Sequence, residues 1–139
     1  METNIHKPLI ENTKQLTTPI DWTNISFYSN LSEGFIRQYQ DKVDWNALLE
    51  ANKYSEEFLI EFQDRLDWMD ISSSQKLSES FMAKFSDKLH WAFIAKTQTL
   101  SEEFIRKFQY RLDWWDIKYY QNLSHDFKDE FKNHLNSQF

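Results

Sequence analysis

The sequence predicts an all-α protein: an α-solenoid of short helix pairs with a 23-residue repeat, a degenerate N-terminal unit and a C-terminal capping helix. Three observations predict this class. Ser, Phe, Leu and Trp return every 23 residues, and a fixed period of about 20 to 50 residues is typical of solenoids and arrays. One Gly and two Pro leave little turn chemistry for a β-rich fold. The apolar residues of each copy also recur at helical spacing.

The copy at residues 100–122, LSEEFIRKFQYRLDWWDIKYYQN, shows how one repeat is expected to fold. Ser101 predicts the N-cap of a first helix, and Asp113 predicts the N-cap of a second helix that starts at Trp114. Apolar residues flank both caps in the pattern of a hydrophobic staple. Each repeat is therefore expected to hold two helices of roughly nine or ten residues, which are too short to be stable unless neighbouring repeats stack. Leucine-rich repeats have a similar length, but no copy contains their leucine spacing.

We expect the whole chain, residues 1–139, to form a single helical repeat domain. In the degenerate first unit, Ile20, Asp21 and Trp22 match the second helix of the later copies, whereas the preceding half is more polar. The last unit stops before a tryptophan and predicts a capping helix. The expected units are 1–30, four full copies at 31–53, 54–76, 77–99 and 100–122, and the half-repeat 123–139.

Composition excludes several classes of function. No cysteine is present for a disulfide framework or a thiolate metal site. No stretch has the length of a signal peptide's apolar run or of a membrane span, so we expect a soluble cytoplasmic protein without membrane contact. The formal net charge of −6 disfavours direct nucleic-acid binding.

Two columns of the repeat have both a structural and a functional interpretation. The tryptophans are expected to close the seams between repeats, although they could instead stack on bases. The basic residues are expected in the last turn of each first helix, where a cation is stabilised by the helix dipole, although a basic column could also follow a phosphate backbone. These columns are Trp22, Trp45, Trp68, Trp91 and Trp114, and Lys42, Arg65, Lys88 and Arg111.

No pattern predicts an enzyme, a metal or a cofactor. The carboxylates are accounted for as helix caps and first-turn residues. His90 takes the place of a capping Asp and should weaken that cap. Phosphate-loop, nucleophile-elbow and His-Glu metal motifs are missing from the sequence, and no metal-ligand spacing joins His6, His90, His125 and His134.

Residues that differ between copies are the candidates for partner binding, because the residues that agree serve the stack. The copy at 100–122 is much the most aromatic, and Trp and Tyr are favoured at protein interfaces. The alternative is that these rings pack on the capping helix. The candidate partner-binding residues are Tyr110, Trp115, Tyr119, Tyr120 and Phe93.

The segment LSEEFIRKFQYRLDWWDI resembles a tandem repeat found in proteins of large DNA viruses and bacteriophages, a family that is largely uncharacterised. The resemblance covers residues 31–135 and, weakly, 9–30. It implies a viral or phage setting, with the cytoplasm of the host cell as the location, and it brings no catalytic residues.

Two functions are expected from these observations. The first is a non-catalytic protein–protein interaction module that binds a host or viral protein. The alternative is a small acidic viral inhibitor that imitates nucleic acid and blocks a host nuclease or defence factor. Its carboxylate rows would include Glu33, Glu56, Glu79 and Glu102.

Overall fold

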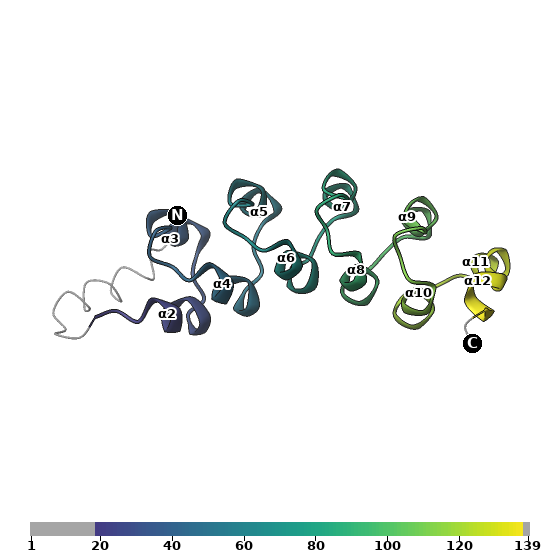
Figure 1. The fold of residues 1–139 in the computed structure, drawn as a ribbon, viewed down its shortest axis with the longest axis horizontal. Helices are drawn as coiled ribbons and strands as arrows, with labels where there is room; N and C mark the ends of the chain where they lie inside the picture. The colour runs from purple at the N-terminus through teal and green to yellow at the C-terminus, as the bar shows by residue number, and fades with distance from the viewer. Residues whose placement is uncertain (1–18, 138–139) are drawn as a thin grey trace. The chain divides into compact units, whose positions relative to one another are not determined.

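The computed structural model describes residues 19–137, and every regular element in that range is a helix (Figure 1). This confirms the predicted all-α repeat architecture of paired helices. The predicted first half of the degenerate N-terminal unit lies outside the described residues. The helices are α2 (Trp22–Tyr28), α3 (Glu33–Gln38), α4 (Trp45–Ala51), α5 (Glu56–Glu61), α6 (Trp68–Ser74), α7 (Glu79–Lys84), α8 (Trp91–Thr97), α9 (Glu102–Phe108), α10 (Trp114–Tyr120), α11 (His125–Glu130) and α12 (Lys132–Asn136).

The helices begin where the capping pattern places them. Each serine of the Ser column accepts a hydrogen bond from the backbone nitrogen of the phenylalanine three residues later, which satisfies one of the unpaired N–H groups at a helix start. In the helices that begin at Trp, the capping aspartates accept hydrogen bonds from backbone nitrogens two or three residues later. His90 makes no side-chain capping bond, as its place in the Asp column predicts.

The helices are shorter than the sequence analysis predicts, with six or seven residues in most of them instead of nine or ten. The chain leaves the first helix one turn early, at the second aromatic residue of the copy or, in α9, one residue later. In the second full copy Phe62 is the C-cap, and the nitrogen of Arg65 donates to its carbonyl at 2.8 Å. A tight hydrogen-bonded turn therefore replaces the predicted last turn of the helix.

The chain divides into two compact units, residues 1–66 and 67–139. In the first unit α2 packs against α4, and in the second α8 packs against both α6 and α10, while α12 packs against α10 and α11. Within each unit the Ser-capped helices form one row and the helices that begin at Trp form another (Figure 1). The single domain over residues 1–139 stays a prediction.

Each tryptophan of the repeat packs on the first helix of the copy that follows it. In the first unit Trp45 lies 4.9 Å from Phe62, measured between ring centroids. In the second unit Trp68 lies 5.3 Å from Phe85, and Trp114 lies 4.9 Å from Phe131. The interpretation of the Trp column as packing residues is therefore confirmed.

Glutamine side chains add a second tie between consecutive copies, which the sequence analysis missed. The amide of Gln98 donates to the carbonyl of Gln75 at 2.7 Å and accepts from the nitrogen of Leu77 at 2.9 Å. Gln121 repeats the arrangement, donating to the carbonyl of Gln98 at 2.8 Å. The signal in the sequence is an amide residue at the same position of every full copy.

No helix between residues 19 and 137 is long and apolar enough to cross a membrane.

Candidate functional site

Three aromatic residues of α10 form the candidate site, and we call Trp115, Tyr119 and Tyr120 the aromatic surface. Their exposed fractions are 46%, 71% and 50%. The rings of Trp115 and Tyr119 are 4.9 Å apart and only 8° from parallel, and Tyr120 lies 5.5 Å from Tyr119. Three of the five predicted partner-binding residues are thus contiguous and open to solvent.

The helical register of α10 explains how neighbouring tryptophans divide between core and surface. Trp114 is the first residue of α10, and its ring meets Phe131, the residue that follows α11. Trp115 is the next residue, so it points about 100° away and comes onto the same face as Tyr119, four residues later. The tie to the capping helix is made by Trp114, whose ring lies 4.8 Å from that of His134. The alternative that the aromatic surface packs on the capping helix stays a prediction.

The other two predicted residues do not join the aromatic surface. Tyr110 is 95% exposed in the turn between α9 and α10. Phe93 is half-buried on α8. Within residues 19–137, no ring contact links either one to Trp115 or Tyr119.

A second exposed aromatic pair lies on α2, where the sequence analysis named no candidate. Phe27 and Tyr28 are 39% and 76% exposed, and their rings meet edge to face at 4.8 Å. They stand four repeats before Tyr119 and Tyr120, in the same two columns. Extending the column comparison to the degenerate first unit would have found them.

The basic column lies outside the first helices, so the prediction that it stabilises their last turns is wrong. The helices end too early for that role. Instead the Arg111 guanidinium lies 5.9 Å from the centre of the Trp91 ring, donates to the carbonyl of Ser86 and pairs with Asp87 at 2.9 Å. Arg65 lies over Trp45 in the first unit in the same way, and Lys88 lies over Trp68 in the second. These cations serve the packing of consecutive copies.

Three glutamates of the proposed nucleic-acid mimic, Glu33, Glu79 and Glu102, accept hydrogen bonds from the capping serine of the next copy. Glu79 accepts hydrogen bonds from both the backbone nitrogen and the hydroxyl of Ser101, and Glu33 accepts the same pair from Ser55. Hydrogen bonds from Ser124 hold the pKa of Glu102 below its ordinary value. Carboxylates used in this way are fixed by the stack, and reversing their charge would disturb folding before it tested any binding.

No group of three or more His, Asp or Glu residues in the described range 19–137 is placed to hold a metal ion. Comparisons with protein-family models, with curated proteins and with solved structures find no match to this chain. The fold and the aromatic surface together define a helical repeat protein with one unusually aromatic copy. The resemblance to a viral and phage repeat stays a prediction.

Proposed function

We propose that this chain is a non-catalytic module that binds another protein through the aromatic surface on α10. The observation that carries the proposal is the nearly parallel stack of Trp115 on Tyr119, with both rings partly exposed to solvent. The repeat does not require these rings, because Trp114 already supplies the packing tryptophan of this copy. An exposed Trp and two Tyr on one short helix offer a large apolar area at low conformational cost.

The surroundings of the aromatic surface fit the anatomy of a protein interface. Asp113 precedes Trp115 in the sequence and Lys118 follows it. Both side chains are exposed and provide charged groups near the apolar centre. A polar margin around aromatic anchors is typical of such interfaces. Because Trp115 and Tyr119 already hold each other in place, little side-chain freedom remains to be lost on binding.

The experiment compares the full-length protein with two double variants as baits in a lysate of the cells in which the protein occurs. Trp115→Ala/Tyr119→Ala removes the aromatic stack, and Phe27→Ala/Tyr28→Ala removes the exposed pair of α2 as a matched control. We expect a partner that the unmodified protein and the α2 variant retain, and that the α10 variant retains at roughly thirtyfold lower affinity, the effect of losing about 2 kcal/mol at an interface hot spot. Equal recovery by both variants would reject the aromatic surface as the binding site.

The viral or phage setting and the cytoplasmic location are parts of this proposal that rest on the resemblance. The nucleic-acid mimic also stays a prediction. Its test needs exposed carboxylates that do not accept hydrogen bonds from the next copy, such as Asp64 and Glu103. Inhibition of a nuclease that survives Asp64→Lys and Glu103→Lys at high and low salt would speak against mimicry.

A further inference from the structure

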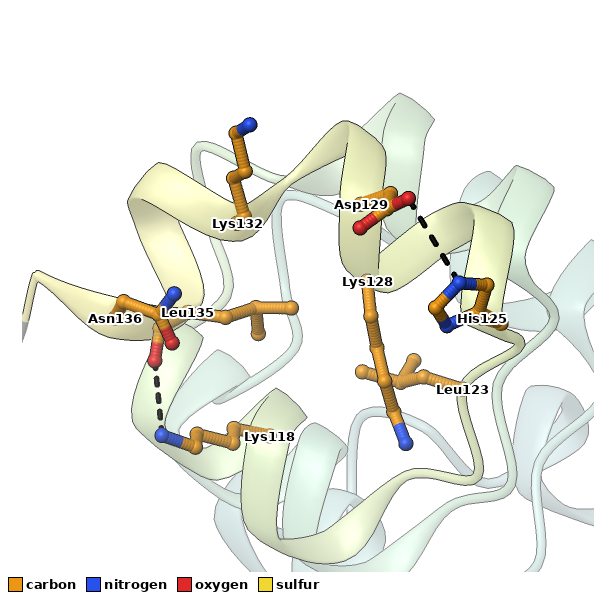
Figure 2. A pocket seen from close by; sticks show the side chains of 8 residues that line it. All are labelled: Lys118, Leu123, His125, Lys128, Asp129, Lys132, Leu135 and Asn136. Atoms are coloured by element: carbon orange, nitrogen blue, oxygen red, sulfur yellow. Dashed lines mark hydrogen bonds and ion pairs between the residues drawn. The ribbon is translucent and has the colours of Figure 1, made fainter.

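A cavity of about 540 Å³ lies at the carboxyl end of the second unit, among α10, α11 and α12 (Figure 2). Its size is within the range of small-ligand sites in proteins. None of the residues of the aromatic surface lines it. Its walls are Lys118, Leu123, His125, Lys128, Asp129, Lys132, Leu135 and Asn136.

The cavity has an apolar floor that the fold keeps in place. Leu123 and Leu135 are each more than nine-tenths buried and still line the cavity. The Lys118 ammonium donates to the carbonyl of Leu135 at 3.0 Å, which fastens the short capping helix α12 to α10 (Figure 2). An ammonium group carries three donors, so Lys118 keeps two for a ligand.

The charge of the cavity wall is opposite to that of the chain as a whole. Three lysines and a single carboxylate, that of Asp129, line the cavity, and this carboxylate lies 3.8 Å from the imidazole of His125. The side-chain ammonium groups of Lys128 and Lys132 form no ion pair or hydrogen bond with any residue between 19 and 137. The formal net charge of the chain is nevertheless −6. The cavity wall thus carries three lysines against one carboxylate, which makes it a local positive site.

We propose that this cavity binds an acidic peptide segment of a partner protein, in which an apolar side chain stands beside Asp or Glu. The apolar side chain would rest on Leu123 and Leu135, and separate carboxylates of the segment would meet Lys128 and Lys132, whose ammonium groups point to opposite sides of the cavity (Figure 2). A long polyanion such as nucleic acid is disfavoured, because the acidic remainder of the chain repels it beyond the few residues that the lysines cover. A short acidic segment has no such extended charge.

The probe is a fluorescein-labelled peptide, Ser-Asp-Leu-Glu-Leu-Asp-Ser, titrated into the full-length protein while anisotropy is measured. The comparison ligands are the neutral peptide Ser-Asn-Leu-Gln-Leu-Asn-Ser, a ten-residue thymidine oligonucleotide and inorganic phosphate. We expect the acidic peptide to bind about tenfold more tightly than the neutral one, because charge complementarity supplies the difference. Amide signals of residues 118–136 should shift in the NMR spectrum when the acidic peptide is added.

Two lysine variants distinguish an effect of the cavity lysines from an effect of the net charge of the chain. Lys128→Gln/Lys132→Gln should weaken binding of the acidic peptide at least about fivefold, while Lys42→Gln/Lys76→Gln, which changes the charge equally elsewhere, should change it less than about twofold. Trp115→Ala/Tyr119→Ala should leave binding of the acidic peptide unchanged. The proposal for the cavity can therefore be rejected without rejecting the proposal for the aromatic surface. Equal affinity for the two peptides, equal loss in both lysine variants, or tighter binding of the oligonucleotide or of phosphate would each overturn the proposal.

Discussion

Trp114 and Trp115 are adjacent in the sequence, yet the first packs on Phe131 of the capping half-repeat and the second stacks on Tyr119 in contact with solvent. One ring serves the stack of repeats, and we propose that the other binds a partner. The same division applies along the chain, because residues shared by all copies hold consecutive copies together. Residues particular to one copy are where a specific function can reside.

Replacing a tryptophan of the packing column should cost far more stability than replacing Trp115. Trp68 contacts both Phe81 and Phe85 of the next copy and is covered by Lys88. We expect Trp68→Ala to lower the free energy of unfolding by about 3 kcal/mol, at the lower end of the range for large aromatic truncations because Trp68 is half-buried. Urea denaturation followed by circular dichroism measures this change.

Trp115→Ala is the control for that measurement. Its ring touches Tyr119 alone among the rings of residues 19–137, so the expected loss is about 0.5 kcal/mol or less. If Trp68→Ala left the urea midpoint unchanged, the packing role of the column would be wrong.

Restoring the missing cap at residue 90 should stabilise the protein. His90 makes no capping bond, whereas Asp67 in the preceding copy accepts from the nitrogen of Met69 at 2.7 Å. His90→Asp should raise the free energy of unfolding by about 1 kcal/mol, the usual effect of an N-cap. The reciprocal change Asp67→His should lower it by a similar amount. A stability that fell in both variants would show that the histidine has another role at its position.

The glutamate ties should contribute to stability although they lie near the surface. Glu79→Ala removes two hydrogen bonds to Ser101 and should cost about 1 kcal/mol, since these bonds are charge-assisted but half-exposed. Glu103→Ala, which removes an exposed carboxylate in the first turn of α9, is the matched control with a smaller effect. Comparable losses of stability in the two variants would mean that removal of a negative charge, and not loss of the hydrogen bonds from Ser101, lowers the stability.

Tyr54 should make the protein less stable at high pH. Burial raises the pKa of Tyr54 from 10.0 to about 12. Below pH 10 the phenol is protonated in both the folded and the unfolded chain, so it has no pH-dependent effect. Between pH 10 and about 12 the unfolded chain releases the proton first, and stability falls as the pH rises.

The check is the difference in urea midpoint between pH 8 and pH 11 for the unmodified protein and for Tyr54→Phe. The unmodified protein should lose more stability over this interval, because the variant has no buried phenol to titrate. The other titrating groups are common to both proteins and cancel in the comparison. An equal loss would show that Tyr54 ionises as easily when folded as when unfolded.

The fold could be predicted from the sequence because its determinants are local and repeated. Ser101, Asp113 and Trp114 set helix starts through bonds within four residues, and the fixed interval of 23 residues multiplies that signal. Helix length was less predictable. It depends on the tight turn after the second phenylalanine, which an amphipathic pattern continuing to Leu112 does not reveal.

The polar and ionic contacts between copies were the part that could not be predicted. The interpretation of Glu79 as a first-turn residue and of Arg111 as a helix-end cation considers one helix at a time, whereas both side chains reach an adjacent copy. The aromatic surface was identified because Trp115 and Tyr119 break the column pattern. The lysine-lined cavity was missed because its walls come from three helices that the repeat does not bring together elsewhere.

The most direct test of the central claim is photo-crosslinking from the aromatic surface. Tyr119 is replaced by p-benzoylphenylalanine, and Tyr28, an exposed tyrosine outside the aromatic surface, is replaced in the same way as the control. After irradiation in a cell extract, the claim predicts a discrete crosslinked protein from position 119 that is lost with Trp115→Ala and does not form from position 28. No crosslink from position 119, or the same product from both positions, would contradict it.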